Sequence, residues 1–379
     1  MSSKATWKGT ENATYTAKWT NVQNTYNFDA GDGTCDVETM TIGWEDAYTL
    51  PTPTAPTYDG EDGECAFDGW FLGETIIAQS GDSWTYSNQG GTLVAHYTCK
   101  KDIAGSTPAV DAENGTVTYG IYPQTRISDE TMIKCLNVWT AESNGWYLLD
   151  GSYYAKKSAS PYKSSYVFDD GATIVWGTTY WFKCEPITWK ILSSDNGEYS
   201  LVSTVLLDAH RYNGDYSGTK NGRYANNYAW SEIREWLYNE FYYSAFSLGN
   251  SLIQTTTVDN SASTTSSSSN KYACANTYGE VVYLLSYKDY LNADYGFSTD
   301  EDAHDTARRC KTTDWARANG AWYSTSSSYL YNGYYWTRSP GSSYSYDAWR
   351  VNGDGGLCSD GVSDSDLSVR PSLRIKVAQ

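Results

Sequence analysis

The stretch TYWFKCEPITWKILSS, residues 179–194, has the pattern that decides the fold of this chain. It is rich in aromatic and β-branched residues, which fit the pleated, half-buried surface of a strand. Three further stretches share this composition: TVTYGIYP (116–123), YSLVSTVLLD (199–208) and EVVYLLSY (280–287). Several short strands of this kind predict antiparallel β-sheet in the C-terminal two thirds of the chain.

Two helical regions interrupt these strands. In SEIREWLYNEFYYSAF (231–246), Ser231 is placed to cap the helix, and one stripe of apolar residues faces the core. The residues of this stripe recur three or four positions apart: Ile233, Trp236, Leu237 and Phe241. The sequence therefore predicts an α+β fold, with antiparallel sheets and two helices.

The second helix is expected from DAHDTARRC (302–310) and TTDWARANG (312–320), and it would end at Gly320. Between the two helical regions, SASTTSSSSN (261–270) predicts a flexible polar loop.

The N-terminal hundred residues contain a repeat. ATYTAKWT (13–20) and TLVAHYT (92–98) alternate in the same way, so Leu93, Ala95 and Tyr97 are expected on one face of a strand. Residues 1–20 then form the tail of a preceding β repeat, residues 21–99 form one whole repeat, and residues 100–115 form a linker. LPTPTAPTYDG (50–60) and FDGWFLGET (67–75) resemble the Listeria–Bacteroides repeat of internalin B type. This resemblance implies a spacer module of a bacterial surface protein.

Charge and composition exclude several classes of partner. The 379 residues carry a net charge of −18, so we expect binding neither to nucleic acid nor to an anionic membrane surface. No apolar run approaches the roughly 20 residues that span a bilayer, so membrane insertion is not expected. The 35 Tyr and 16 Trp against 8 Phe favour surfaces and interfaces over dry cores.

The eight cysteines are scattered, and none lies in a Cys-x-x-Cys pair, which disfavours zinc. We expect disulfides of an extracellular or cell-surface protein whose signal and anchor lie outside this sequence, with buried free thiols as the alternative. The predicted pairs are Cys35–Cys65, Cys135–Cys184 and Cys274–Cys310.

Residues 341–368 form the most unusual segment. YYWTRSP (334–340) and SVRPSLRI (368–375) flank it and read as strands, whereas Ser, Tyr, Asp and Gly fill its middle. Four apolar residues recur within it at intervals of five or six positions: Val351, Leu357, Val362 and Leu367. We interpret them as buried anchors between outward-facing residues. The alternative is a plain solvated loop, because turns also favour Gly, Asp and Ser.

The stretch from 117 to 376 carries YPQTR, EPITWKIL, YANNYAWSEIREWLYNEFYYSAFS, TTTVDN, DTARRCKTTDWARANG, YWTRSP and VRPSLRI. With these motifs it resembles a bacterial domain family of unannotated function, which is similar to the formylglycine-generating-enzyme-like branch of the C-type-lectin-like fold. Relatives of that family include the variable proteins of diversity-generating retroelements, in which scrambled Asn codons cannot produce Lys, Glu, Gln, Met or Trp. The 341–368 segment contains none of these residues except Trp349, which would be fixed framework.

The resemblance implies a ligand-binding set within this segment and just before it. The set comprises Ser342, Ser343, Tyr344, Ser345, Tyr346, Asp347, Arg350, Asn352, Asp354, Ser359, Asp360, Ser363, Asp364, Ser365 and Asp366. The run 323–335 has the same composition and adds Tyr331, Tyr334 and Tyr335, for which the edge of the core is the alternative. Arg338 and Arg370 are interpreted as structural, each pairing with a carboxylate such as Glu185 or Asp259, with an anion clamp as the alternative.

We find no catalytic or metal-binding pattern. His96, His210 and His304 fit neither a metal cage nor a Ser-His-Asp arrangement, and the paired cysteines of the formylglycine-generating relatives have no counterpart here. Acidic runs at 29–36 and 352–356 are interpreted as turns rather than calcium sites, so no cofactor is expected.

The predicted function is therefore non-catalytic: a receptor or adhesin with a diversified binding surface. Its partner would be a protein or glycan on another cell, a phage or a host surface. The alternatives are a carbohydrate-binding adhesin with a fixed site of Trp and Tyr residues, and an enzyme on the formylglycine-generating scaffold.

Overall fold

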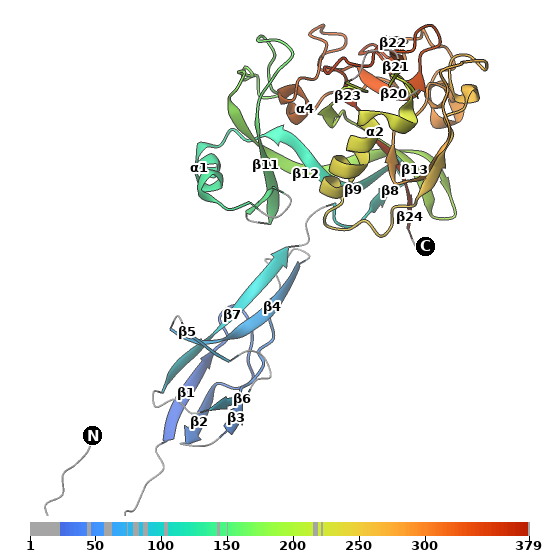
Figure 1. Cartoon of the computed structure of the whole chain (residues 1–379). Coiled ribbons are helices and arrows are strands. Elements are labelled where there is room, and N and C mark those ends of the chain that lie inside the picture. Colours follow the sequence, from blue (N-terminus) through green and yellow to red (C-terminus); the bar gives the residue numbers. More distant parts are fainter. Residues whose placement is uncertain are drawn as a thin grey trace, which may run out of the picture. The chain divides into compact units, whose positions relative to one another are not determined.

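The computed structural model describes residues 23–43, 47–56, 63–73, 75–78, 83–85, 90–101, 105–141, 145–149, 151–214, 219–220 and 223–377. The chain divides into two compact units, Met1–Asp102 and Ile103–Gln379 (Figure 1). Each unit has its own sheets and its own hydrophobic core.

The first unit is built from strands alone among its described residues. They are β1 (Gln23–Asp29), β2 (Thr39–Gly43), β3 (Ala47–Thr49), β4 (Gly63–Leu72), β5 (Thr75–Ala78), β6 (Ser83–Thr85) and β7 (Gly91–Lys101). Five of them form a sheet in the order β2-β1-β7-β4-β5, and β3 pairs with β6. β1 and β7 are parallel, whereas the other neighbours in the sheet are antiparallel.

The core of this unit confirms the alternation predicted for residues 92–98. Leu93 and Ala95 are buried, whereas Thr92 and His96 point to solvent. Half-buried Tyr97 packs against the same core and donates a hydrogen bond of 3.1 Å to the carbonyl of Ala30. The earlier copy of the repeat, at 13–20, lies outside the described residues.

The three predicted disulfide pairs are wrong. Cys65 is disulfide-bonded and lies opposite Cys99 in the register of β4 and β7. The other cysteines whose state the structure gives are free: Cys35, Cys135, Cys184, Cys274, Cys310 and Cys358. Buried Cys184 and Cys310 therefore fit the alternative of small apolar core residues.

The second unit is larger and contains both strands and helices. Its strands are β8 (Ala109–Asp111), β9 (Thr116–Arg126), β10 (Tyr147–Leu149), β11 (Ser152–Ser158), β12 (Thr179–Asp195), β13 (Glu198–Ser203), β14 (Asp208–Ala209), β15 (Thr219–Lys220), β16 (Arg223–Tyr224), β17 (Thr256–Val258), β18 (Thr277–Glu280), β19 (Val282–Tyr283), β20 (Tyr335–Pro340), β21 (Asp347–Val351), β22 (Leu357–Gly361), β23 (Ser368–Val369) and β24 (Ser372–Lys376). Its helices are α1 (Glu130–Val138), α2 (Glu232–Trp236), α3 (Tyr243–Ala245) and α4 (Asp314–Ala318). Single turns of 3₁₀-helix are η1 (Tyr228–Trp230), η3 (Ala262–Thr264), η4 (Asp289–Leu291) and η5 (Ala293–Tyr295), and η2 (Leu237–Tyr242) is π-helical.

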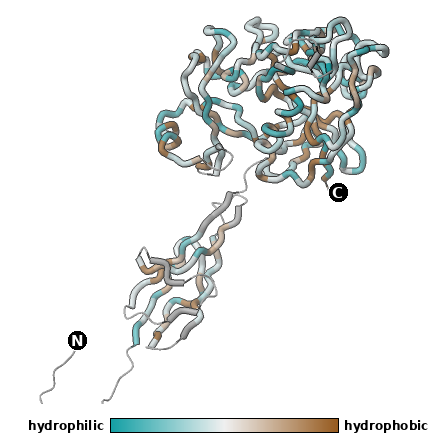
Figure 2. The backbone as a smooth tube through the Cα atoms, viewed as in Figure 1, coloured by the Kyte–Doolittle hydropathy of each residue, from teal (hydrophilic) through white to brown (hydrophobic). Residues whose placement is uncertain are grey.

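The long strand β12 organises an eight-stranded sheet. The order is β10-β11-β12-β13-β24-β19, and β9 pairs with both β12 and β8. Trp189 of β12 is fully buried and donates a 2.7 Å hydrogen bond to the carbonyl of Tyr119. Pro186 lies where the register between β12 and β9 shifts, as expected for a residue that has no N–H to donate. Figure 2 shows hydrophobic residues concentrated around β13 and β24.

The four predicted strands correspond to β9, β12, β13 and β19. The linker predicted at residues 100–115 is wrong in part. β8 lies inside residues 100–115 and pairs with β9. The amide of Gly120 also donates to the carbonyl of Gly105 at 2.8 Å. The second unit therefore begins earlier than the sequence pattern indicated.

The first predicted helical region is confirmed. The Ser231 hydroxyl accepts a hydrogen bond from the amide of Arg234, and helical turns continue through α2, η2 and α3. The second region is shorter than predicted, because only α4 is helical. Residues 302–310 form turns instead, and the Asp305 carboxylate accepts the amides of Ser298 and Ala307. Helix α1, capped by Asp129, was not predicted.

The polar loop at 261–270 is fastened to β20 at several points. The Asn270 amide donates to the carbonyls of Pro340 and Gly341 at 3.1 and 3.3 Å, and the Ser339 hydroxyl donates to the carbonyl of Thr264 at 3.1 Å. The loop therefore supports the start of the 341–368 segment.

The described residues are mostly β-sheet with a few short helices, which agrees with the predicted fold class at this level. Among them, no helix has the length and apolar character to cross a membrane.

Candidate functional site

The 341–368 segment belongs to a five-stranded sheet with the order β14-β23-β20-β21-β22. Strand β20, which leads into the segment, is buried along its whole length. Strands β21 and β22 extend the sheet outward as an antiparallel pair from Asp347 opposite Gly361 to Val351 opposite Leu357. A rigid inner strand therefore holds a more exposed outer hairpin.

Two buried arginines hold the strands on either side of the segment. Arg338 forms a 2.7 Å ion pair with Asp289 and donates to the backbone carbonyl of Asp259. Arg370 donates to the carbonyl of Ser203 and to the hydroxyl of Tyr335, both at 2.9 Å. Both side chains contact framework groups, as the structural interpretation predicts, and the Arg370→Ala variant tests that role.

The carboxylate partners that we predicted for these arginines are wrong. Asp259 contributes its backbone rather than its carboxylate, and Glu185 accepts from the hydroxyl of Thr125 instead. Most hydrogen bonds of the two guanidinium groups go to backbone carbonyls. The chain around β20 is irregular, so these carbonyls have no strand partner and are free to accept.

The four predicted anchors are all buried. Val351 and Val362 are fully buried, Leu367 is 1% exposed and Leu357 is 7% exposed. They pack into the two large cores of the unit. The polar residues between them are exposed or half-exposed, so the segment is neither a loose loop nor part of the interior.

The turn between β20 and β21 forms the most exposed part of the segment. Ser342, Ser343 and Tyr344 all face solvent, and the ring of Tyr344 stacks on that of Tyr346 with centres 5.3 Å apart. Buried Asn226 fixes the backbone behind this turn. Its side-chain amide donates to the carbonyls of Tyr344 and Asp347, and its backbone N–H donates to Ser345.

A second group, which we name the acidic–aromatic cluster, combines residues from three parts of the chain. It contains Trp322, Tyr334, Arg350, Asp360, Asp364 and Asp366. The rings of Trp322 and Tyr334 stack with centres 3.8 Å apart, and the Arg350 guanidinium lies 4.0 Å from the centre of the Tyr334 ring. Aromatic and arginine side chains arranged in this way are typical of the residues that contribute most to binding.

The carboxylates of this cluster affect one another. Burial, together with the hydrogen bond and the charge of Asp360, raises the pKa of Asp364 to about 6. Burial and the charge of Asp360 also raise the pKa of Asp366 and that of Asp347. The half-exposed residues Ser359 and Ser363 and the exposed Ser365 complete this surface.

Not every residue of the predicted binding set faces solvent. Tyr335 is fully buried, and its hydroxyl donates to the carbonyl of Arg308, so its place in the binding set was wrong. Asn352 and Asp354 lie in the turn between β21 and β22. Asn352 accepts from Arg350, and Asp354 accepts the amide of Gly356 at 3.0 Å. Trp349 packs against Tyr287, which fits the framework role we predicted for it.

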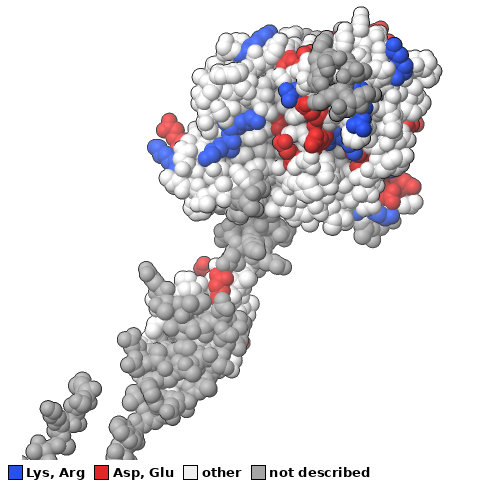
Figure 3. All heavy atoms as spheres, viewed as in Figure 1, with Lys and Arg blue, Asp and Glu red and all other residues white. Residues whose placement is uncertain are grey.

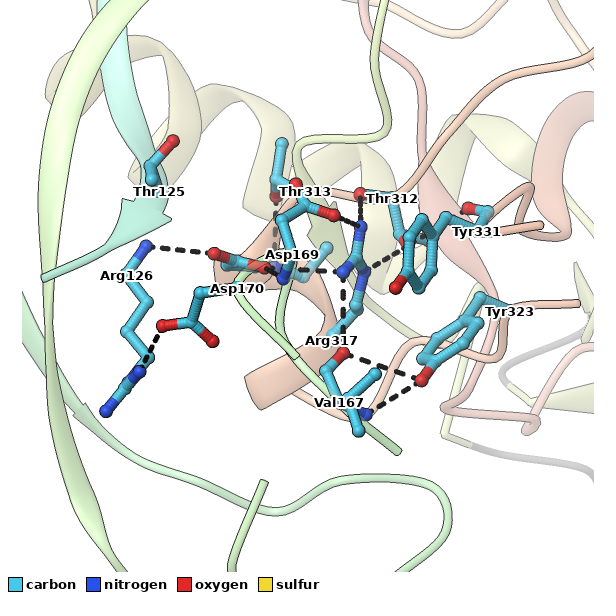
Figure 4. Close-up of polar contacts among 12 residues, drawn as sticks. Thr125, Arg126, Val167, Asp169, Asp170, Thr312, Thr313, Arg317, Tyr323 and Tyr331 are labelled. Atoms are coloured by element: carbon cyan, nitrogen blue, oxygen red, sulfur yellow. Dashed lines mark hydrogen bonds and ion pairs between the residues drawn. The ribbon is translucent and has the colours of Figure 1, made fainter. Parts of the chain in front are cut away.

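Tyr331 is occupied by an internal contact. It has a φ of +67°, and its ring lies 4.1 Å from the guanidinium of fully buried Arg317. Arg317 also bonds to Asp169, Asp314 and the carbonyl of Val167 (Figure 4). This arrangement joins α4 to the 166–170 segment, so Tyr331 belongs to the framework and not to the binding surface.

A cavity of about 570 Å³, which we name the Trp176 pocket, adjoins the acidic–aromatic cluster. Ser365 and Asp366 line one side of it, and Tyr162, Trp176 and Arg211 line another. Trp176 is 73% exposed. These residues were not predicted from the sequence, because Tyr162, Trp176 and Arg211 lie 179, 165 and 130 positions before the start of the segment at 341. The signal that pointed to them was the excess of Trp and Tyr.

The histidines do not form a metal or catalytic centre in the described part of the chain. His210 stacks on Trp236, His304 lies 3.4 Å from Asp354, and His96 stacks on Phe71 in the first unit. Among the described residues, no group of three or more His, Cys, Asp or Glu side chains could hold a metal ion. The acidic runs at 29–36 and 352–356 contain turns, in which Asp29 accepts from Gly31 and Asp354 from Gly356.

Comparisons with known proteins give one match. Residues 197–377, from β13 to the end of β24, match the model of a family described as a domain of unknown function, DUF6273. Neither the curated proteins nor the solved structures gave a match. The matched region contains the whole five-stranded sheet and all residues of the predicted binding set.

Proposed function

We propose that the second unit is a non-catalytic binding domain, a receptor or adhesin, that displays exchangeable side chains on its 341–368 segment. One observation carries this proposal: four buried anchors hold the segment on a stiff sheet while the residues between them reach the surface. A side chain that points outward from such a framework can be replaced with little effect on folding. The C-type-lectin-like fold and diversification by a retroelement are part of the proposal and rest on the sequence motifs.

The chemistry of the segment supports protein or glycan binding. Exposed Tyr344, on which Tyr346 stacks, offers preorganised aromatic contact area, and the surrounding serines and aspartates adapt their hydrogen bonds. Figure 3 shows both acidic and basic side chains on the visible face of the second unit. The segment carries five Asp and one Arg. We therefore expect a neutral or basic partner surface. An extracellular or cell-surface location belongs to the same proposal, and the disulfide of Cys65 supports it.

Exchange of the outward residues tests the proposal. In a first set of variants, five outward serines are replaced by Tyr, Asn, Asp or Ala in random combination: Ser342, Ser343, Ser359, Ser363 and Ser365. A matched set replaces the anchors by the same residues. We expect members of the first set to keep the melting temperature within a few degrees and to acquire different ligands in a panel of surface proteins and glycans. We expect members of the second set to unfold.

The coding DNA gives an independent test of the retroelement. Codons for the outward positions should end in a pyrimidine, and a near-copy rich in AAC should lie beside a reverse transcriptase gene. Purine-ended codons at these positions would contradict diversification, and unfolding of the first set of variants would contradict the exchangeable surface itself.

A further inference from the structure

A second cavity, remote in sequence from the 341–368 segment, has the composition of a carbohydrate site. It measures about 520 Å³, and we name it the Trp230 pocket. The lining residues that matter here come from η1, α2, η2 and β18: Trp230, Arg234, Glu235, Tyr238, Asn239 and Tyr278. We propose that this pocket binds a neutral oligosaccharide at a fixed site, independent of the diversified surface.

Three aromatic side chains at the pocket are unusually exposed. Tyr278 is 74% exposed, Trp230 is 62% exposed and Tyr238 is 44% exposed. Single exposed aromatic side chains are common on protein surfaces, but several around one cavity mark a binding site. Ring faces of this kind pack against the apolar C–H faces of sugar rings, in the way that aromatic surfaces bury apolar groups.

Two of the three aromatic residues, Trp230 and Tyr238, are held in place before any ligand arrives. The guanidinium of Arg223 lies 3.3 Å from the centre of the Trp230 ring. Tyr238 stacks on Tyr242, and its hydroxyl accepts a 3.3 Å hydrogen bond from Tyr243. A preorganised lining loses little conformational entropy on binding.

The backbone at the pocket is also unusual. Tyr238 and Asn239 lie in η2, the π-helical part of the helix. π-helical turns are rare and are frequently found at functional sites, where they place side chains differently from a regular helix. Here the turn brings an aromatic ring and a side-chain amide to the same cavity.

Charge selects the class of sugar. The Nε of Arg234 donates a 2.9 Å hydrogen bond to the buried carboxylate of Glu280. Because the two charges are paired with each other, neither is left for a ligand. Exposed Glu235 is balanced by Arg223 on the Trp230 ring, so the surroundings of the pocket carry no excess charge, and Asn239 can donate and accept hydrogen bonds. A lining without an excess of positive charge does not favour uronic acids or sialic acids, and it fits the hydroxyl groups of neutral sugars.

Titration calorimetry with the full chain tests this site. The probes are tetrasaccharides of glucose, galactose, mannose, xylose and N-acetylglucosamine. We expect at least one to bind with a dissociation constant below about 1 mM, and Tyr278→Ala to weaken that binding by about tenfold or more. Trp176→Ala, which removes an equally exposed aromatic residue from the other pocket, is the matched control and should leave binding unchanged.

Two results would overturn the inference: no probe binds the wild-type chain at millimolar concentration, or Tyr278→Ala binds as tightly as the wild type. Because Tyr278 is so exposed, its replacement leaves the core intact, which an unchanged melting temperature confirms. A chain with exchanged residues in the 341–368 segment should bind the same tetrasaccharide as before. This measurement distinguishes a failure of the Trp230 pocket from a failure of the exchangeable surface.

Discussion

Arg350 on β21 and Asp360 on β22 form an ion pair of 2.8 Å across the outer hairpin of the five-stranded sheet. Both residues lie in the 341–368 segment, ten positions apart, and the antiparallel register brings them to the same side of the hairpin. The pair places the Asp360 carboxylate beside Asp364 and Asp366, and burial together with the charge of that carboxylate raises the pKa of both. The first prediction follows from this arrangement.

We expect Asp364 to make the stability of the second unit depend on pH. Its pKa is raised to about 6 in the folded chain, so the folded state holds the proton more tightly than the unfolded state between about pH 4 and pH 6. Stability should therefore decrease as pH rises through this window. Asp364→Asn should be more stable than the wild type at pH 7 by about 1 kcal/mol, allowing for solvent screening of a largely exposed group, and equal to it near pH 4. Urea unfolding at each pH measures the difference, and parallel pH profiles would contradict the prediction.

Arg370→Ala should destabilise the fold without acting on a ligand. The side chain is 3% exposed, and its loss leaves the carbonyl of Ser203 and the hydroxyl of Tyr335 without their donor. We expect a loss of about 3–5 kcal/mol, measured by thermal unfolding. Arg374→Ala, which removes an exposed guanidinium from the neighbouring β24, is the control and should cost less than about 0.5 kcal/mol. A variant that keeps its melting temperature and stops binding would instead support an anion clamp.

Gly355→Ala should be costly, although it lies in the middle of the segment proposed to vary. Gly355 has a φ of +95°, and an added Cβ would lie 2.2 Å from the carbonyl oxygen of Asp305. The backbone strain and the steric collision together should lower the free energy of unfolding by about 2–4 kcal/mol. Gly171→Ala is the control, because Gly171 has a similar φ of +82° but open space around it, and it should cost about 1 kcal/mol. Equal losses in chemical denaturation would show that the collision is relieved by movement of the chain.

Arg317→Met should destabilise the second unit by about 3–5 kcal/mol, because it leaves the buried carboxylate of Asp314 without its cation. Burial already raises the pKa of Asp314, which shows how costly its charge is there. Asp314→Asn in the same chain should therefore recover part of the loss. A double-mutant cycle by urea unfolding measures the coupling, and additive losses would contradict the role we assign to the network in Figure 4.

The α2 region and the long strand β12 were within reach of the sequence. Ser231 as the cap, the apolar stripe over Ile233, Trp236 and Phe241, and the aromatic-rich run at 179–194 are local patterns. Helices and strands of this kind depend on neighbouring residues and on which face is buried. The spacing of apolar residues along the sequence therefore predicts them.

The disulfide pairs, the true partners of Arg338 and Arg370, and the place of Tyr335 were beyond the reach of sequence reasoning. Each depends on which strands lie side by side. Asp289 and Ser203 are 49 and 167 positions from the arginines that bind them. Local sequence patterns do not predict contacts between residues so far apart, because many different strand pairings are compatible with the same composition.

The sequence by itself determined a β-rich chain in two units and a segment with buried anchors at Val351, Leu357, Val362 and Leu367. Only the tertiary structure decided that Trp322 and Tyr334 stack beneath Arg350, and that Trp230, Tyr238 and Tyr278 surround one cavity. The physical reason is that hydrophobic spacing fixes which side of a strand or helix is buried. Contacts between distant segments follow from how those buried sides pack together.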